Sequence, residues 1–151
     1  MNWNEYYIGL LEPISRKSKD PRTKVGAVIV DQEYGLISTG FNGFPKGVKD
    51  LPERYNDRPT KYKFIAHADT NAIDIAAKQG KATNHGIMYL PWYPCSNCTK
   101  SIINCGIKKV VIDGREYEEK EKHWTAWKED IDISKIMMSE AGVELEIYKG
   151  E

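Results

Sequence analysis

The chain is organised around two short segments, His67-Ala68-Asp69 and Pro94-Cys95-Ser96-Asn97-Cys98, which contain one imidazole and two thiols. Cys95 and Cys98 are three residues apart at the start of an expected helix, so both thiols lie on one turn and can reach one metal ion. A helix N-terminus also favours thiolate over thiol. If His67 joins them, the three ligands hold zinc with one coordination position open, as in catalytic sites.

A Cys-x-x-Cys pair alone is also compatible with a thioredoxin-like redox centre or a structural metal site. The redox interpretation leaves His67 unexplained, and the early βαβ unit of thioredoxin-like proteins is missing. If parallel strands alternate with helices, residues 67 and 95 begin helices at the same sheet edge, where open α/β sheets bind ligands. We leave His85, His123 and Cys105 outside the site, as two surface histidines and a small core residue.

Length and charge limit the classes of protein that need to be considered. The chain has 151 residues, which predicts a single domain over residues 1–151 with a core large enough to need no disulfides. Its 22 basic and 22 acidic residues cancel, which argues against nonspecific nucleic-acid binding. The N-terminus has no signal-peptide pattern and no apolar run is long enough to span a membrane. Three crowded cysteines fit thiolate ligands in a reducing, cytoplasmic setting.

Hydrophobic periodicity predicts an α/β chain with a mixed sheet between helix layers. Helices are expected over 3–17, 64–78, from residue 95 to about 105, and over 124–141. Strands are expected over 25–30, 36–41, 86–90, 110–112 and 143–147. Residues 48–63 are polar with two prolines, which predicts an irregular loop of the kind that often forms a lid. Residues 113–122 are expected to be a charged loop or a helix start.

Two loops are candidates for ligand contacts. Residues 16–24 gather five basic side chains against one acidic one, which fits either a solvated loop or a phosphate-binding edge. Residues 42–47 contain two glycines, a proline and Asn42, which fits either an ordinary turn or a loop that approaches a ligand closely. Neither segment decides between its alternatives alone.

The two motif segments resemble the H-x-E and P-C-x-x-C signature of zinc-dependent nucleotide deaminases. Residues 18–27, 38–47 and 140–143 further resemble the deoxycytidylate deaminase branch of the cytidine/deoxycytidylate deaminase superfamily, and the similarity runs from about residue 5 to 148. The resemblance implies a cytidine-deaminase-like three-layer α/β/α sandwich with a mixed five-stranded sheet. It also implies Zn²⁺ as cofactor and hydrolytic deamination of dCMP to dUMP and ammonia.

One position departs from the family pattern. The family glutamate that moves protons during deamination is Asp69 here, with an arm shorter by one carbon, about 1.5 Å. Three interpretations stay open: a weakened proton shuttle, a shuttle rescued by a backbone shift or a water, and a protein that binds nucleotides with little turnover. A purely structural alternative is that Asp69 caps its helix near Asn71.

The resemblance also implies substrate contacts. Asn42 corresponds to a sugar and base contact, and the backbone amide of Ala68 faces the pyrimidine carbonyl. The 5′-phosphate is expected at Arg22, Thr23 and Lys24. Tyr117 is a further expected contact, although a surface tyrosine is the alternative. Trp92 and Tyr93 are expected either to wall the base pocket or to pack in the core.

Regulation and assembly are expectations from the resemblance as well. The segment 40–47 resembles the loop through which relatives respond to dCTP and dTTP effectors with Mg²⁺, and relatives form homo-oligomers, hexamers or dimers. The expected partner is a small pyrimidine deoxynucleotide, with no nucleic acid and no membrane. The substrate alternatives are a modified cytidylate, a free nucleoside, a guanine-type base or an adenosine of transfer RNA. A non-catalytic nucleotide-binding homologue is the alternative from another class.

Overall fold

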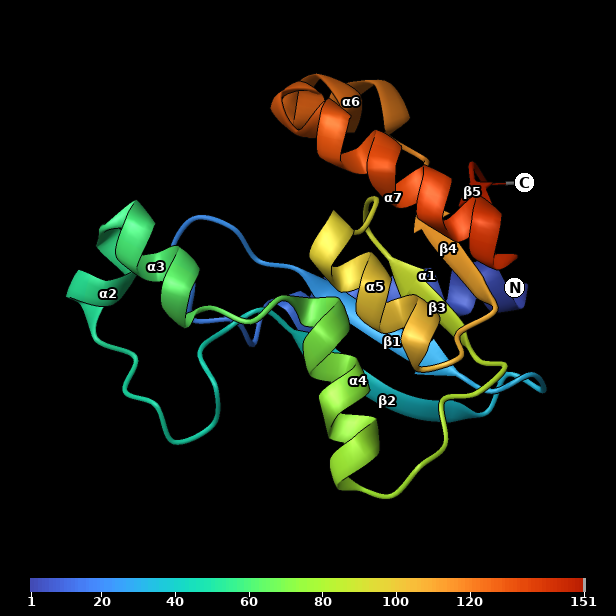
Figure 1. The fold of residues 1–151 in the computed structure, drawn as a ribbon, viewed down its shortest axis with the longest axis horizontal. Helices are drawn as coiled ribbons and strands as arrows, with labels where there is room; N and C mark the ends of the chain where they lie inside the picture. The colour runs from blue at the N-terminus through green and yellow to red at the C-terminus, as the bar shows by residue number, and fades with distance from the viewer. Residues whose placement is uncertain (151) are drawn as a thin grey trace.

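The computed structural model of the protein describes residues 1–150, so Glu151, the last residue of the predicted domain, lies outside the described residues. Five strands form one sheet in the order β2-β1-β3-β4-β5 (Figure 1). The strands are β1 (Gly26–Val30), β2 (Leu36–Phe41), β3 (Ile87–Leu90), β4 (Lys109–Asp113) and β5 (Glu144–Tyr148). β1 is antiparallel to both β2 and β3, and β3, β4 and β5 are mutually parallel. The mixed five-stranded sheet is confirmed.

Helices cover both faces of this sheet. Helix α1 (Trp3–Ser15) packs on one face, and helices α4 (Ala68–Lys78), α5 (Ser96–Asn104) and α7 (Lys128–Ala141) cover the other (Figure 1). Successive residues of β1 point to opposite faces, so Val28 and Val30 contact the α1 side while Ala27 and Ile29 contact the α4 side. All five residues of β1 are buried, which explains its continuous apolar run. The three-layer α/β/α prediction is confirmed.

The helices that carry His67 and the two cysteines of the motif begin at one edge of the sheet. Because β2 and β3 both run antiparallel to β1, they end at the same edge, and the helices that follow them, α4 and α5, begin there. Gly40 allows α4 to approach β2 closely. A Cβ atom at this position would lie 2.4 Å from the Ala68 carbonyl oxygen and 2.5 Å from the Ala72 amide nitrogen. The first turn of α4 therefore packs directly on β2 backbone.

The prediction of an irregular loop over residues 48–63 is wrong, because two short helices form there. They are α2 (Pro52–Asn56) and α3 (Arg58–Phe64), and they project from the body of the molecule (Figure 1). Pro52 and Pro59 occupy first-turn positions, where proline is favoured because no backbone N–H is needed. The Asp57 carboxylate caps α3 by accepting from the Thr60 amide at 3.2 Å. The prolines that suggested a loop are helix starts.

The C-terminal helical region is also divided differently from the prediction. Helix α6 (Tyr117–Trp124) occupies the charged segment, a 3-10 turn η1 (Thr125–Trp127) follows, and α7 begins only at Lys128. None of α6, η1 and α7 has a side-chain cap at its N-terminus. None of the helices in residues 1–150 combines the length and the apolar character required to cross a membrane.

Candidate metal centre and nucleotide cavity

His67, Cys95 and Cys98 meet at the edge where α4 and α5 begin. The His67 Nδ1 atom lies 3.2 Å from the Cys98 Sγ and 3.5 Å from the Cys95 Sγ. All three donor atoms lie within 4.8 Å of one another. Tetrahedral zinc, with Zn–N near 2.1 Å and Zn–S near 2.3 Å, separates such donors by roughly 3.5 Å. The donor set and its spacing therefore fit one zinc ion.

Local helix geometry positions each of the three donors. Cys95 is the N-cap of α5, and its Sγ accepts from the Cys98 amide at 3.4 Å. Its carbonyl oxygen accepts from both the amide and the hydroxyl of Thr99, at 2.9 and 2.8 Å. His67 is the N-cap of α4, and its carbonyl oxygen accepts from the Asn71 amide. The two caps present the imidazole and the thiols toward one point.

The three donors also influence one another electrostatically in the metal-free protein. A hydrogen bond from the Cys98 thiol lowers the pKa of Cys95, and the His67 hydrogen bond adds to this effect. The same contact with the Cys95 thiolate, together with burial, raises the pKa of Cys98. The hydrogen bond with Cys95 raises the pKa of His67. The two thiols thus hold one proton between them, which a metal cation would displace.

Asp69 lies beside this cluster in the first turn of α4. Its side chain is only 6% exposed, and it lines the cavity described below. Burial raises the pKa of Asp69, against the opposing effect of a hydrogen bond from the Cys98 thiol. Its Oδ1 accepts from the Thr70 amide at 2.9 Å, whereas the Asn71 amide bonds to His67. A carboxyl group with a raised pKa beside a metal site is suited to proton transfer.

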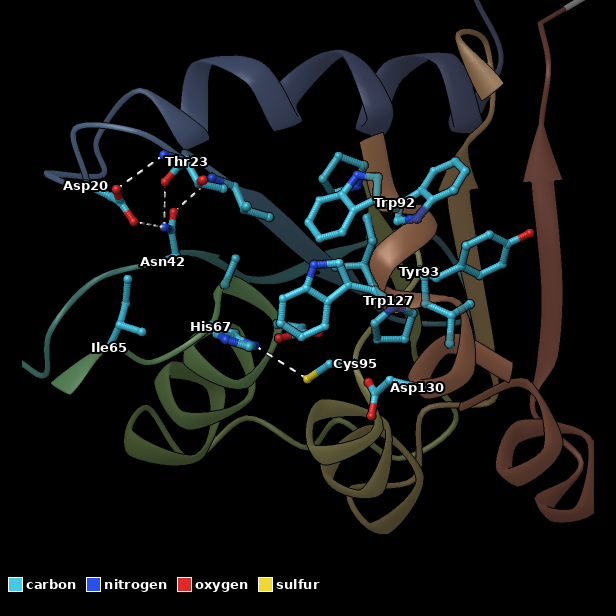
Figure 2. Close-up of a pocket in the computed structure, with 18 of the residues that line it drawn as sticks. Asp20, Thr23, Asn42, Ile65, His67, Trp92, Tyr93, Cys95, Trp127 and Asp130 are labelled. Carbon is cyan, nitrogen blue, oxygen red and sulfur yellow. Dashed lines mark hydrogen bonds between the residues drawn. The ribbon is translucent and has the colours of Figure 1, made fainter. Parts of the chain in front are cut away.

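A cavity of about 420 Å³ opens at this edge, within the size range of small-molecule sites. His67 and Cys95 lie between two ends of different character (Figure 2). One end holds the hydrogen-bonded group of Asp20, Thr23 and Asn42, and the other is walled by aromatic rings (Figure 2). The aromatic lining side chains are Tyr62, Trp92, Tyr93, His123, Trp124 and Trp127.

Trp92 and Tyr93 belong to both the core and the cavity wall, so the two alternatives considered for them are compatible. They are 7% and 9% exposed, pack edge to face at a centroid distance of 4.9 Å, and line the cavity. The Trp92 indole Nε1 is buried without a hydrogen-bond partner among residues 1–150. Such a group costs about 1–3 kcal/mol, a penalty that core packing alone does not explain.

The loops that carry Asp20 and Asn42 are held by buried hydrogen bonds. The Asp20 carboxylate accepts from the amides of Arg22 and Thr23, and its other oxygen lies 2.6 Å from the Lys61 Nζ. Burial would raise the pKa of Asp20, but these hydrogen bonds outweigh it and lower the pKa. The Asn42 amide donates to the Thr23 carbonyl and accepts from the Val25 amide, each at 2.8 Å. Asn42 thus shapes this end of the cavity.

The predicted substrate residues divide into two groups. Asn42, Thr23, Ala68 and Asp69 line the cavity together with His67 and Cys95, whereas the buried Cys98 is not among the lining residues. Arg22, Lys24 and Tyr117 are absent from its lining, so their substrate contacts stay predictions.

The side chains of this second group lie elsewhere. Lys24 donates to the Ser18 carbonyl at 2.7 Å and lines a separate hollow with Arg115. Tyr117 packs on Trp92 at a centroid distance of 5.2 Å.

Several lining residues were not identified from the sequence. Arg58, Lys61 and Tyr62 come from the unpredicted helix α3, and His123, Trp124 and Trp127 from α6 and η1. His123 is exposed, as predicted, and is not part of the metal cluster, yet its ring lines the cavity. The aromatic residues at 123, 124 and 127 are the sequence feature that could have indicated a cavity wall, but we interpreted residues 124–141 as an ordinary amphipathic helix. No local pattern placed α3 beside the site.

Comparison with known proteins identifies the family and supports the fold of the chain. A family model described as the cytidine and deoxycytidylate deaminase zinc-binding region matches residues 1–113. The chain belongs to this family. The matched segment includes His67, Cys95 and Cys98, so zinc is the metal that the cluster is built to bind.

Individual deaminases of the family resemble the chain over most of its length. A deaminase of Aliivibrio fischeri encoded in the luxG 3′ region is 36% identical over 143 residues, covering 95% of this chain and 91% of the relative. The deoxycytidylate deaminase of Mus musculus is 36% identical over 127 residues, covering 81% of this chain and 70% of the relative. The dCMP deaminase of cyanophage S-TIM5, solved with dCMP and dUMP, superposes with a TM-score of 0.72 at 26% identity and 95% coverage of each chain.

Proposed function

We propose that the protein is a zinc-dependent deaminase that hydrolyses dCMP to dUMP and ammonia and thereby supplies the substrate for thymidylate synthesis. The observation that carries this proposal is the cluster of His67, Cys95 and Cys98 beside the buried Asp69, at a cavity that His67, Cys95 and Asp69 line. Support for dCMP comes from the relatives: the mouse deaminase is named for deoxycytidylate, and the cyanophage enzyme was solved with dCMP and dUMP.

Each residue has a proposed role in this reaction. His67, Cys95 and Cys98 would hold zinc, which supplies Lewis-acid activation of water when bound. Asp69 would take the proton of the attacking water and deliver protons to the ring nitrogen N3 and to the departing ammonia. The backbone at Ala68 and the amide of Asn42 would orient the pyrimidine and the sugar. The aromatic wall would hold the base by stacking, because every base offers an apolar face.

The comparison of three substrates tests the proposal. The metal-loaded protein is incubated with dCMP, deoxycytidine and dCTP, and ammonia release is measured. We expect the highest kcat/KM for dCMP. Comparable turnover of deoxycytidine would favour a nucleoside deaminase, and zinc and nucleotide binding without ammonia release would favour the non-catalytic alternative.

We propose that the 5′-phosphate binds at the cavity end formed by Asp20, Thr23 and Asn42 and that Arg58 supplies its positive charge. Lys61 also lines this end, but the buried carboxylate of Asp20 neutralises its ammonium group. Arg58 has no ion-pair partner within residues 1–150 and lines the same cavity, so its guanidinium is available for a bidentate phosphate contact.

We expect Arg58→Gln to raise the KM for dCMP about tenfold or more, since a hydrogen bond to a charged group contributes about 1.5–3 kcal/mol. Turnover of deoxycytidine should not change, because it has no phosphate. Lys63→Gln is the control, since it removes an exposed cation of the same helix that does not line the cavity. An equal loss for both substrates in Arg58→Gln would contradict the assignment.

Regulation and assembly are proposed on the basis of the family resemblance alone. The segment 40–47 would respond to dCTP as an activator and dTTP as an inhibitor with Mg²⁺, and the protein would form a homo-oligomer, a hexamer or a dimer. Its three free cysteines support a reducing, cytoplasmic location. Velocity measured with each effector, and the mass in solution, test these proposals.

A further inference from the structure

Three of the aromatic side chains that line the cavity lie in residues 117–127, here called the wall segment, in which Tyr117 and Trp124 pack against the core but no residue is buried. His123, Trp124 and Trp127 lie in α6 and η1, neither of which contains a buried residue. Trp127 is 46% exposed. Because apolar burial is the main force that fixes a helix on a domain, this segment needs other contacts to keep its rings beside the site.

Two polar contacts tie the segment to the sheet edge. At its beginning, the Lys120 ammonium donates to the carbonyl oxygens of Pro91 and Asp113, at 3.2 and 2.7 Å. These carbonyls follow β3 and end β4, so Lys120 links α6 to the strand ends. At the other end of the segment, Asp130 in the first turn of α7 makes the second contact.

Asp130 binds the helix that carries the thiols. Its Oδ2 accepts from the Ser96 amide at 2.8 Å, and its Oδ1 accepts from the Ser96 hydroxyl at 2.6 Å. Ser96 directly follows Cys95 and is the first residue of α5. Asp130 itself lines the cavity near Cys95 and Trp127 (Figure 2). One carboxylate therefore connects the aromatic wall with the start of the thiol-bearing helix.

The thiol turn does not need Asp130 for its own shape. The Cys95 carbonyl and thiol already accept three hydrogen bonds from residues 98 and 99 of the same turn. The wall segment has less support of its own, since α6 and η1 have neither a side-chain cap nor a buried residue, whereas α7 beyond them is held in the core by Ile131, Ser134 and Met138. Removing the Asp130 contact should consequently loosen the wall far more than the metal cluster.

We propose that Asp130 is a positioning residue that fixes the aromatic wall over the metal cluster, so that nucleotide affinity depends on it. The effect on nucleotide affinity rests on the proposed function, whereas the effect of Asp130 on the position of the wall segment does not. The bidentate contact to a charged group determines where Trp127 and its neighbours stand relative to Cys95. Its loss would weaken nucleotide binding while zinc stays in place.

The test compares Asp130→Ala with Asp132→Ala in the full-length, zinc-loaded protein. Asp132 is an exposed carboxylate of the same helix whose one ion pair among residues 1–150 is with Lys128, at 2.7 Å, so its removal is a matched control. We expect Asp130→Ala to raise the KM for dCMP by about tenfold or more, with kcat and zinc content little changed, because misplaced binding groups weaken substrate positioning. In the absence of nucleotide, amide hydrogen exchange over residues 117–131 should be faster in Asp130→Ala than in wild type. Asp132→Ala should change neither the KM for dCMP nor the hydrogen exchange over residues 117–131.

A second pair of variants guards against misfolding of Asp130→Ala. Asp130→Asn can still accept from one Ser96 donor and should fall between wild type and alanine. Ser96→Ala removes only the hydroxyl donor, so it should be mild, and its effect should not add to that of Asp130→Ala.

Three results would overturn the inference. Equal exchange over 117–131 in the alanine variants at 130 and 132 would show that Asp130 does not hold the wall. Faster exchange with an unchanged KM would show that the wall does not contact the nucleotide. Loss of zinc in Asp130→Ala with a normal KM for the loaded fraction would show that Asp130 supports the metal cluster instead. If wild type does not turn over dCMP, the proposed function fails, while the exchange comparison still decides whether Asp130 holds the wall.

Discussion

Asp69→Glu is expected to raise the kcat for dCMP by about a hundredfold, because the longer arm restores the reach of the family carboxylate and a misplacement of about 1 Å can cost that much. Asp69→Asn is expected to abolish ammonia release, since an amide cannot take the proton of the attacking water. The measurement is steady-state ammonia release by zinc-loaded proteins of equal metal content.

The Asp69 series also separates the three interpretations of the shorter arm. Equal rates for aspartate and glutamate would mean that the backbone or a water already compensates. Turnover in the glutamate form alone would mean that the site with aspartate binds nucleotide without efficient catalysis. Asn at this position is the control for folding: burial raises the pKa of Asp69, so the charged carboxylate is unfavourable in the metal-free protein, and the neutral amide should not destabilise it.

Loss of one thiol should remove zinc and deamination together. Cys98→Ala is expected to weaken zinc binding by more than about a hundredfold, because even outer-shell changes at zinc sites cost about 10–100-fold. Zinc content per chain and dCMP turnover are measured on the same preparation. Cys105→Ala is the matched control, since this half-buried thiol packs against the core and is not part of the metal cluster.

The same cluster predicts how zinc affinity varies with pH. In the metal-free protein the pKa of Cys95 is lowered and that of Cys98 is raised, so one thiol proton remains and must leave when zinc binds. Zinc affinity should therefore rise with pH, which a chelator competition at several pH values measures.

Zinc retained by Cys98→Ala at full stoichiometry would show that the cluster has been assigned wrongly.

The sequence predicted the metal cluster because local geometry determines most of it. Two cysteines three residues apart must share a helix turn, and the flanking strands must place that turn at the sheet edge where the His67 helix also begins. The five strands were predictable for a similar reason, because buried β-branched runs such as residues 26–30 have few alternatives to a strand.

Helices α2 and α3 were missed because their local signals are weak and ambiguous. Each is under two full turns, and each has in its first turn a proline that also fits a loop. The break between α6 and α7 was missed because the aromatic residues over 124–127 continue the helical spacing of the segment that follows.

The sequence by itself thus determined the sheet, the three metal-ligand candidates and the unusual aspartate, because these depend on contacts between near neighbours or on the order of strands and helices. Only the tertiary structure decided what lines the rest of the cavity. It brings Arg58 and residues of the 123–131 segment to the cavity that His67 and Cys95 line, and Lys24 to another hollow. The physical reason is that these positions depend on packing and on distant hydrogen bonds, such as Asp20 with Lys61 and Asp130 with Ser96, which no local periodicity encodes.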